Sequence, residues 1–274
     1  MSGQSLLKAE AAGNDFLVGI GEWARRLAGD GELVARLCRR RRGIGADGAL
    51  ALFPGDGATV RLVYRNADGS GAAFCANGTR CAALAAVRWL GMPPRLTVET
   101  GRGPVPAAVG EAGVALELAP PEAGPRPVTL EAGGRRWEGV LLTFGVPHLV
   151  LRTAALDRLE LARIAPPLRA HPALGPDGAN VHFTEPAGPG RIAIRSFERG
   201  VEAETLSCGS GAVAAALLAM ADDRRTAMAV LVRSGDTLHV EAAGTPPACA
   251  VRLTGPARIV AAVEPDPATP FPGR

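Results

Sequence analysis

The chain has 274 residues, of which 47% are hydrophobic and 21% charged, a composition typical of a folded globular protein. Its 30 basic and 27 acidic residues leave a formal charge of +3, too small to indicate a nucleic-acid or membrane partner. Lys8 is the sole lysine, so an enzyme that forms a Schiff base would have one candidate amine. We therefore expect no pyridoxal cofactor.

Five cysteines occur without Cys-x-x-Cys spacing and without a histidine nearby in the sequence. This pattern is typical of reduced thiols and gives no zinc-ligand signature, so we expect no metal ion. Residues 1–16 lack the apolar core of a secretory signal. Residues 211–221 form an apolar stretch that is well short of the roughly 20 residues needed to span a bilayer. We expect a cytoplasmic protein.

In chain order, the first predicted strand contains Lys8. An arginine run follows at residues 39–42, and such a run is more typical of a solvated helix face than of a nucleic-acid site. An Ala-rich helix is expected at about residues 79–90, and a second, apolar on all faces and therefore buried, at about 212–220. Short β-branched or alternating runs predict strands at 96–99, 107–109, 114–118, 140–144, 192–197, 228–232, 238–242 and 249–254.

The best break in the pattern lies at residues 119–127, which include four prolines. We expect a first half at residues 1–119, a second half at 120–263 and a disordered tail at 264–274. A return of the last strand to the first half is an alternative.

The two halves share landmarks. Cys75 and Cys208, each in a Gly-rich turn before an Ala-rich helix, lie 133 residues apart, and Asn14 and His148 lie 134 apart. Two landmarks at nearly one offset indicate a duplicated unit. We predict an α+β fold of two pseudo-symmetric domains, each a mainly antiparallel sheet wrapped around a central apolar helix.

A cysteine at the first turn of a helix lies beside unpaired N–H groups that favour an anion. These groups can lower the pKa of the thiol or hold a substrate carboxylate. A lone cysteine there is usually a small buried hydrophobe, as we expect for Cys38, Cys81 and Cys249, the last of these on a strand. Two such cysteines at the duplication offset instead indicate acid/base groups on opposite faces of one carbon.

The sequence also resembles a known family, diaminopimelate epimerase, over residues 6–263. Seven motifs occur in that family's order: Ala12-Gly-Asn-Asp-Phe16, Arg42-Gly-Ile-Gly-Ala-Asp-Gly48, Asn66-Ala-Asp-Gly-Ser70 leading to Cys75-Ala-Asn-Gly-Thr-Arg-Cys81, Gly145-Val-Pro-His148, Asn180-Val181, Glu198-Arg-Gly200 and Glu204-Thr-Leu-Ser-Cys-Gly-Ser-Gly211.

The resemblance implies that Cys75 and Cys208 are the catalytic acid/base pair of a cofactor-independent epimerase. His148 and Glu198 would help to set which cysteine is thiolate, and Arg199 would bind the substrate's distal carboxylate. The implied reaction converts LL-diaminopimelate to meso-diaminopimelate for lysine and peptidoglycan synthesis. The implied substrate-binding residues are Asn14, Asn66, Ala76, Asn77, Asn180, Arg199, Gly209 and Ser210.

Three features depart from the common family pattern. Val146 replaces a frequent asparagine, Ala76 replaces a glycine, and the run from Glu198 to Cys208 is one residue longer. These departures leave open a racemase of another amino acid, such as histidine, with the same mechanism. A non-catalytic amino-acid-binding module is a third hypothesis. The expected partner is a small amino-acid substrate, and a homodimer is left open.

Overall fold

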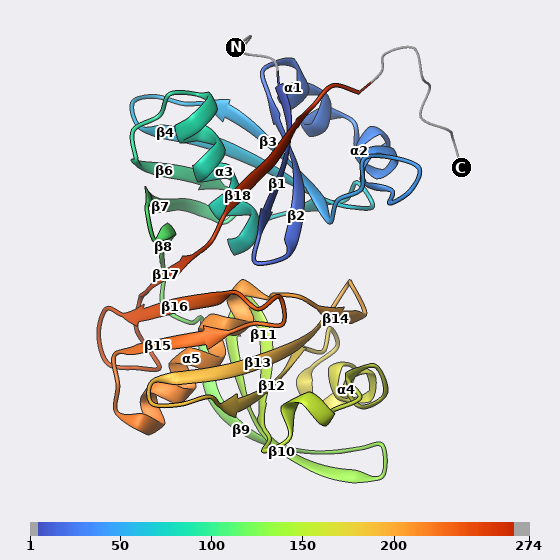
Figure 1. Ribbon diagram of the computed structural model, residues 1–274. Coiled ribbons are helices and arrows are strands. Elements are labelled where there is room, and N and C mark those ends of the chain that lie inside the picture. The colour runs from blue at the N-terminus through green and yellow to red at the C-terminus, as the bar shows by residue number, and fades with distance from the viewer. Residues whose placement is uncertain (1–4, 266–274) are drawn as a thin grey trace. The chain divides into compact units, whose positions relative to one another are not determined.

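The computed structural model describes residues 5–265 (Figure 1). The chain forms two compact units, one comprising the residues up to Leu116 together with those from Gly255 onward, and the other comprising Glu117–Thr254. Residues 264 and 265 follow the last strand, and the rest of the expected tail lies outside the described residues. The domain boundary expected at residue 119 stays a prediction.

The first unit is one mixed sheet with three helices. Its strands pair antiparallel except for the parallel pairs β2–β3 and β4–β6, and β18 pairs with β1. The elements are β1 (Ser5–Ala11), β2 (Asn14–Ile20), α1 (Glu22–Gly29), α2 (Gly31–Cys38), β3 (Gly48–Pro54), β4 (Thr59–Asn66), β5 (Gly71–Ala72), α3 (Ala76–Trp89), β6 (Arg95–Thr100), β7 (Gly103–Gly110), β8 (Gly113–Leu118) and β18 (Arg258–Val263).

The second unit repeats this order. The parallel pairs are β11–β12 and β13–β15, and β9 pairs with β10 as β18 pairs with β1. The elements are β9 (Ala123–Ala132), β10 (Arg135–Phe144), β11 (Val146–Arg152), η1 (Leu156–Arg158), α4 (Leu161–Arg169), η2 (Pro172–Leu174), β12 (Asn180–Pro186), β13 (Arg191–Glu198), β14 (Ala203–Thr205), α5 (Gly209–Asp223), β15 (Ala227–Leu231), β16 (Thr237–Ala242) and β17 (Val251–Gly255). The predicted α+β fold of two pseudo-symmetric, mainly antiparallel sheets is confirmed.

Each sheet wraps around one small-residue helix, α3 in the first unit and α5 in the second (Figure 1). The first eleven residues of α3 are all buried, and α5 is buried along most of its length. Alanine and glycine side chains let the surrounding strands approach closely. Both helices begin about three residues earlier than expected, because the Gly-rich turns hide the start of the helical pattern. Each helix therefore begins directly after a candidate cysteine.

Two local predictions are wrong. The arginine run lies outside the helix, because α2 ends at Cys38 and residues 40–42 form a turn. Cys249 lies in a loop before β17, since Pro246 and Pro247 delay the strand. The second half of the proline-rich segment belongs to β9, which begins at Ala123, because proline breaks a helix but is compatible with extended backbone. No helix among the described residues is long and apolar enough to cross a membrane.

Candidate active site

Cys75 is the N-cap residue of α3. Its Sγ accepts a hydrogen bond from the backbone N–H of Gly78 at 3.5 Å and donates one to Asn14 Oδ1 at 3.7 Å. The side chain is half-buried. The sulfur of Cys75 is therefore in contact with both the Asn14 amide and the first turn of α3.

The amide of Asn14 is fixed by a chain of hydrogen bonds. Its Oδ1 also accepts from Asn77 Nδ2 at 3.3 Å, and its Nδ2 donates to Asp47 Oδ2 at 2.8 Å. Asn77 Oδ1 in turn accepts from the buried guanidinium of Arg80 at 2.8 Å. The two predicted asparagines therefore lie beside Cys75, with Asn14 turned so that its oxygen faces the thiol.

Asp47 belongs to a charged cluster that the sequence analysis did not assign to the site. Its Oδ1 lies 2.8 Å from Arg40, which also bridges to Asp15 at 2.8 Å. Lys8 pairs with Asp15 at 2.6 Å. Burial acts to raise the pKa of Asp15, but Arg40 and Lys8 outweigh it and lower that pKa. Asp47 could have been predicted as a site residue from the sequence, because it lies inside the family motif at residues 42–48.

Asn66 and Ala76 complete the predicted residues of the first unit. Asn66 ends β4 opposite Gly48 of β3, and its Nδ2 donates to Ser70 Oγ at 3.0 Å. Ala76 is the buried first residue of α3. Asn66 is therefore paired with the first residue of β3. Ala76 contributes a backbone N–H group at the N-terminal end of α3.

Cys208 occupies the equivalent position before α5 and is 4% exposed. Its Sγ lies 3.7 Å from Ser210 Oγ. Burial raises the pKa of Cys208 well above its ordinary value, and the neighbouring Glu198 raises it further, against the effect of the backbone N–H of Gly211. The expected lowering of this pKa by the helix end is therefore outweighed, and the resting group is a thiol.

His148 lies within β11 and is fully buried. Its Nδ1 is 2.8 Å from His182 Nε2, and its Nε2 is 3.2 Å from the carbonyl oxygen of Phe144. Burial lowers the pKa of His148 to about 4. His182 was not among the predicted site residues, and its Nδ1 lies 2.8 Å from Ser196 Oγ. A period-two count from Asn180 along the same strand would have placed His182 on the same face.

One ligand atom each from His148, His182 and Cys208 lies within 4.8 Å of the others. Imidazole and thiolate are zinc ligands. Every ring nitrogen of the two histidines already has a hydrogen-bond partner, so an ion that used the facing nitrogens would have to break the bond between the rings. The fold thus brings together histidines and a cysteine that are distant in sequence.

Asn180, Glu198 and Arg199 gather at the ends of β12 and β13. The backbone N–H of Arg199 donates to Asn180 Oδ1 at 2.8 Å, and Thr205 donates its hydroxyl to Glu198. The Arg199 guanidinium lies 3.9 Å from the exposed carboxylate of Asp177. Gly209 and Ser210 form the first turn of α5 after Cys208. The second unit thus holds all of its predicted residues at or near one end of its strands and helix.

The other cysteines are not arranged for catalysis. Cys38 and Cys81 are buried, and burial raises the pKa of Cys38 to about 12 and that of Cys81 further. Burial also raises the pKa of Cys249. Their surroundings are those of small apolar side chains, as expected from the sequence.

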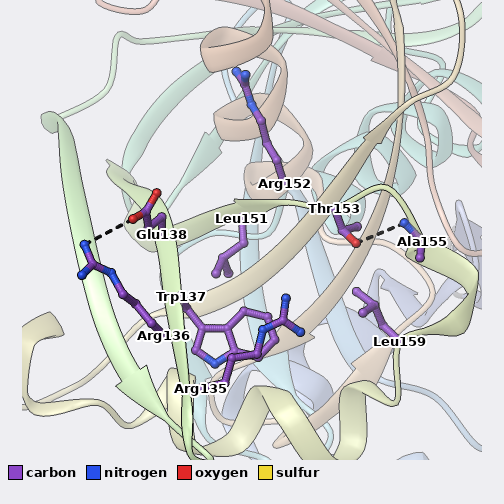
Figure 2. A pocket seen from close by; sticks show the side chains of 9 residues that line it. All are labelled: Arg135, Arg136, Trp137, Glu138, Leu151, Arg152, Thr153, Ala155 and Leu159. Carbon is purple, nitrogen blue, oxygen red and sulfur yellow. Dashed lines mark hydrogen bonds and ion pairs between the residues drawn. The ribbon is translucent and has the colours of Figure 1, made fainter.

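A hollow of about 470 Å³ in the second unit is lined by none of the candidate residues (Figure 2). Arg135 stacks over the Trp137 ring at 4.3 Å, and Arg136 pairs with Glu138 at 3.3 Å. The arginines at its edge thus have partners within the protein, and the hollow is separate from the residues around Cys208.

Comparison with solved structures defines the class of fold. A probable proline racemase from Agrobacterium radiobacter K84 superposes with a TM-score of 0.70 at 18% identity, covering 98% of this chain and 95% of that one. A phenazine biosynthesis protein of the PhzF family from Enterococcus faecalis superposes with a TM-score of 0.69 at 17% identity, covering 94% and 97%. At these identities the similarity establishes the fold.

Sequence comparison gives the family. The diaminopimelate epimerase family model matches residues 7–122 and 140–260. The diaminopimelate epimerase of Chlorobaculum tepidum is 39% identical over 236 residues, covering 84% of this chain and 89% of that protein. That of Archaeoglobus fulgidus is 34% identical, covering 85% and 88%. The chain belongs to the diaminopimelate epimerase family and is an isomerase.

Proposed function

We propose that this protein converts LL-diaminopimelate to meso-diaminopimelate in the cytoplasm, without pyridoxal, for lysine and peptidoglycan synthesis. The relatives that this chain matches over most of their length are named diaminopimelate epimerase. One observation carries the proposal. Each repeated unit presents a thiol as the residue immediately before its central helix, and both thiols match the positions of the family motif.

In the proposed reaction, one cysteine thiolate removes the α-proton while the other thiol donates its proton to the opposite face of the same carbon. One S–H bond forms and another breaks, so the protein's proton count does not change. In the described arrangement Cys75 is a hydrogen-bond donor and burial favours the protonated form of Cys208. One thiol must therefore lose its proton before a turnover. At Cys208, the neighbouring carboxylate that can affect the loss of this proton is Glu198.

The α-proton of an amino acid is far less acidic than a thiol, so the developing carbanion needs stabilisation. The first turns of α3 and α5 have backbone N–H groups without intrahelical partners. We propose that Ala76 and Asn77 from one helix and Gly209 and Ser210 from the other direct these groups at the carboxylate of the reacting carbon. Exclusion of water around bound substrate would strengthen the interaction.

The distal end of the substrate would be bound by Arg199, assisted by Asn180, whose Oδ1 accepts from the backbone N–H of Arg199. The Arg199 side chain is 29% exposed and its guanidinium lies 3.9 Å from Asp177, so a substrate carboxylate could replace that contact with a closer pair. This preference for a second carboxylate favours diaminopimelate over a substrate with one carboxylate.

A racemase of another amino acid is the second candidate, and Val146 is the observation that favours it. This apolar residue begins β11 where many family members have an asparagine. Purified, reduced protein should be assayed with LL-diaminopimelate and, separately, with histidine and other single amino acids, without added cofactor. Faster turnover of diaminopimelate supports the proposal, whereas turnover of a single amino acid alone would replace it with the second candidate.

A further inference from the structure

A continuous hydrogen-bond chain lies beneath Cys208 in the second unit. It joins Ser196 of β13 to His182 of β12, His182 to His148 of β11, and His148 to the carbonyl oxygen of Phe144. The three side chains that form the chain are at most 3% exposed. Because these side chains are buried from bulk solvent, their polar atoms need hydrogen-bond partners in the interior, and each has one in this chain.

The acceptor at one end fixes the direction of every hydrogen bond. A carbonyl oxygen can only accept, so His148 Nε2 carries the proton and donates to Phe144. In a neutral ring the other nitrogen accepts, so His148 Nδ1 receives a proton donated by His182 Nε2. By the same logic His182 Nδ1 accepts from the Ser196 hydroxyl. Burial keeps both rings neutral by lowering their pKa values.

His182 also packs directly on the helix that follows Cys208. A Cβ atom built at Gly211, in the first turn of α5, would overlap the His182 ring. The ring therefore lies against the backbone of α5, and one of its nitrogens is within 4.8 Å of Cys208 Sγ. The same side chain thus contacts both His148 and the turn that holds the thiol.

We propose that His182 is a positioning residue for proton transfer at Cys208. By donating to His148 Nδ1, it prevents that nitrogen from accepting the Cys208 proton and leaves Glu198 as the acid/base partner of the thiol. This inference rests on the proposed function, since it assigns His182 a part in the same reaction. Without the donor, His148 Nδ1 would be available to accept the proton of the thiol.

Two substitutions of His182 separate hydrogen bonding from packing. His182→Leu removes the donor, and we expect kcat to fall about 10-fold with KM nearly unchanged, since the residue does not bind substrate. His182→Gln retains an N–H that can donate to His148, and we expect most of kcat to return. His239→Gln, on the exposed face of β16, is the matched control and should leave both constants unchanged.

Nitrogen-15 NMR of histidine-labelled protein reads the tautomers directly and does not depend on activity. We expect His148 and His182 in the wild-type protein to carry their protons on Nε2. Ser196→Ala removes the hydroxyl that donates to His182 Nδ1. Both rings should keep their protons on Nε2, because the Phe144 carbonyl sets the direction of the chain, but the less firmly held His182 ring should lower kcat several-fold with KM nearly unchanged. This variant also provides the test if His182→Leu does not fold.

Wild-type tautomers with the proton on Nδ1 of either ring would overturn the inference. So would unchanged kcat in folded His182→Leu, or equal loss in the Leu and Gln variants, which would indicate packing alone. If the wild-type protein turns over no amino acid while the NMR result holds, the proposed function fails and the hydrogen-bond chain stands as a structural feature.

Discussion

Asn14 Oδ1 lies 3.7 Å from Cys75 Sγ, and the amide nitrogen of Asn14 donates to Asp47 at 2.8 Å. The carboxylate accepts only, so it fixes which end of the Asn14 amide faces the thiol. Asp47 therefore acts on Cys75 through Asn14, and Arg40 in turn holds Asp47 in place.

Removing this carboxylate should affect activity more than stability. In Asp47→Ala, Asn14 can rotate its N–H groups toward Cys75, and we expect kcat to fall about 10-fold, as for loss of one charge-assisted hydrogen bond. The unfolding free energy should change by at most about 1 kcal/mol, because the Arg40–Asp47 pair is partly exposed. Steady-state kinetics and urea denaturation measure both. Asp56→Ala, on an exposed loop, is the control, and an equal kcat in the two variants would contradict the role of Asp47.

The buried histidines predict a loss of stability in acid. Burial lowers the pKa of His148 from 6.5 to about 4, and that of His182 also falls, so the unfolded chain binds more protons than the folded one in this range. The unfolding free energy should therefore be highest above pH 6.5 and decrease as pH falls toward 4, by about 3 kcal/mol for His148 alone. Denaturation of wild type and His148→Gln at several pH values tests this. The variant should show a shallower dependence, and an identical slope would contradict the prediction.

Gly211 should tolerate no side chain. A methyl group in Gly211→Ala would overlap the His182 ring, which the surrounding strands hold in place, so we expect a loss of about 2 kcal/mol or more in the unfolding free energy. Gly71→Ala is the control, because a Cβ there meets no atom within 4 Å. Thermal denaturation of both variants measures the difference. Equal melting temperatures would mean that the ring can move away from α5.

The sequence predicted the features that repeat along the chain. The glycine-flanked cysteines, their apolar helices and the alternating strands are local patterns, and they located Cys75, Cys208 and the fold class. Asp47 and His182 were missed because their partners are defined by strand register. The parallel pairing that places His148 opposite Asn180, and so brings His182 near it, depends on contacts made by residues distant in the chain. A period-two count places His182 on the same face as Asn180, but no local spacing shows the register that brings this face beside His148.

The two-thiol mechanism is tested most directly by the fate of the α-hydrogen in D₂O. If one cysteine removes the proton and another delivers a new one from solvent, early product should carry deuterium at the inverted carbon while recovered substrate carries almost none. Mass spectrometry and proton NMR at low conversion measure both, and Cys75→Ala and Cys208→Ala should each show no epimerisation. Deuterium returning to substrate with original hydrogen retained in product would indicate a single base, and substantial epimerisation by either alanine variant would contradict the assignment of both cysteines.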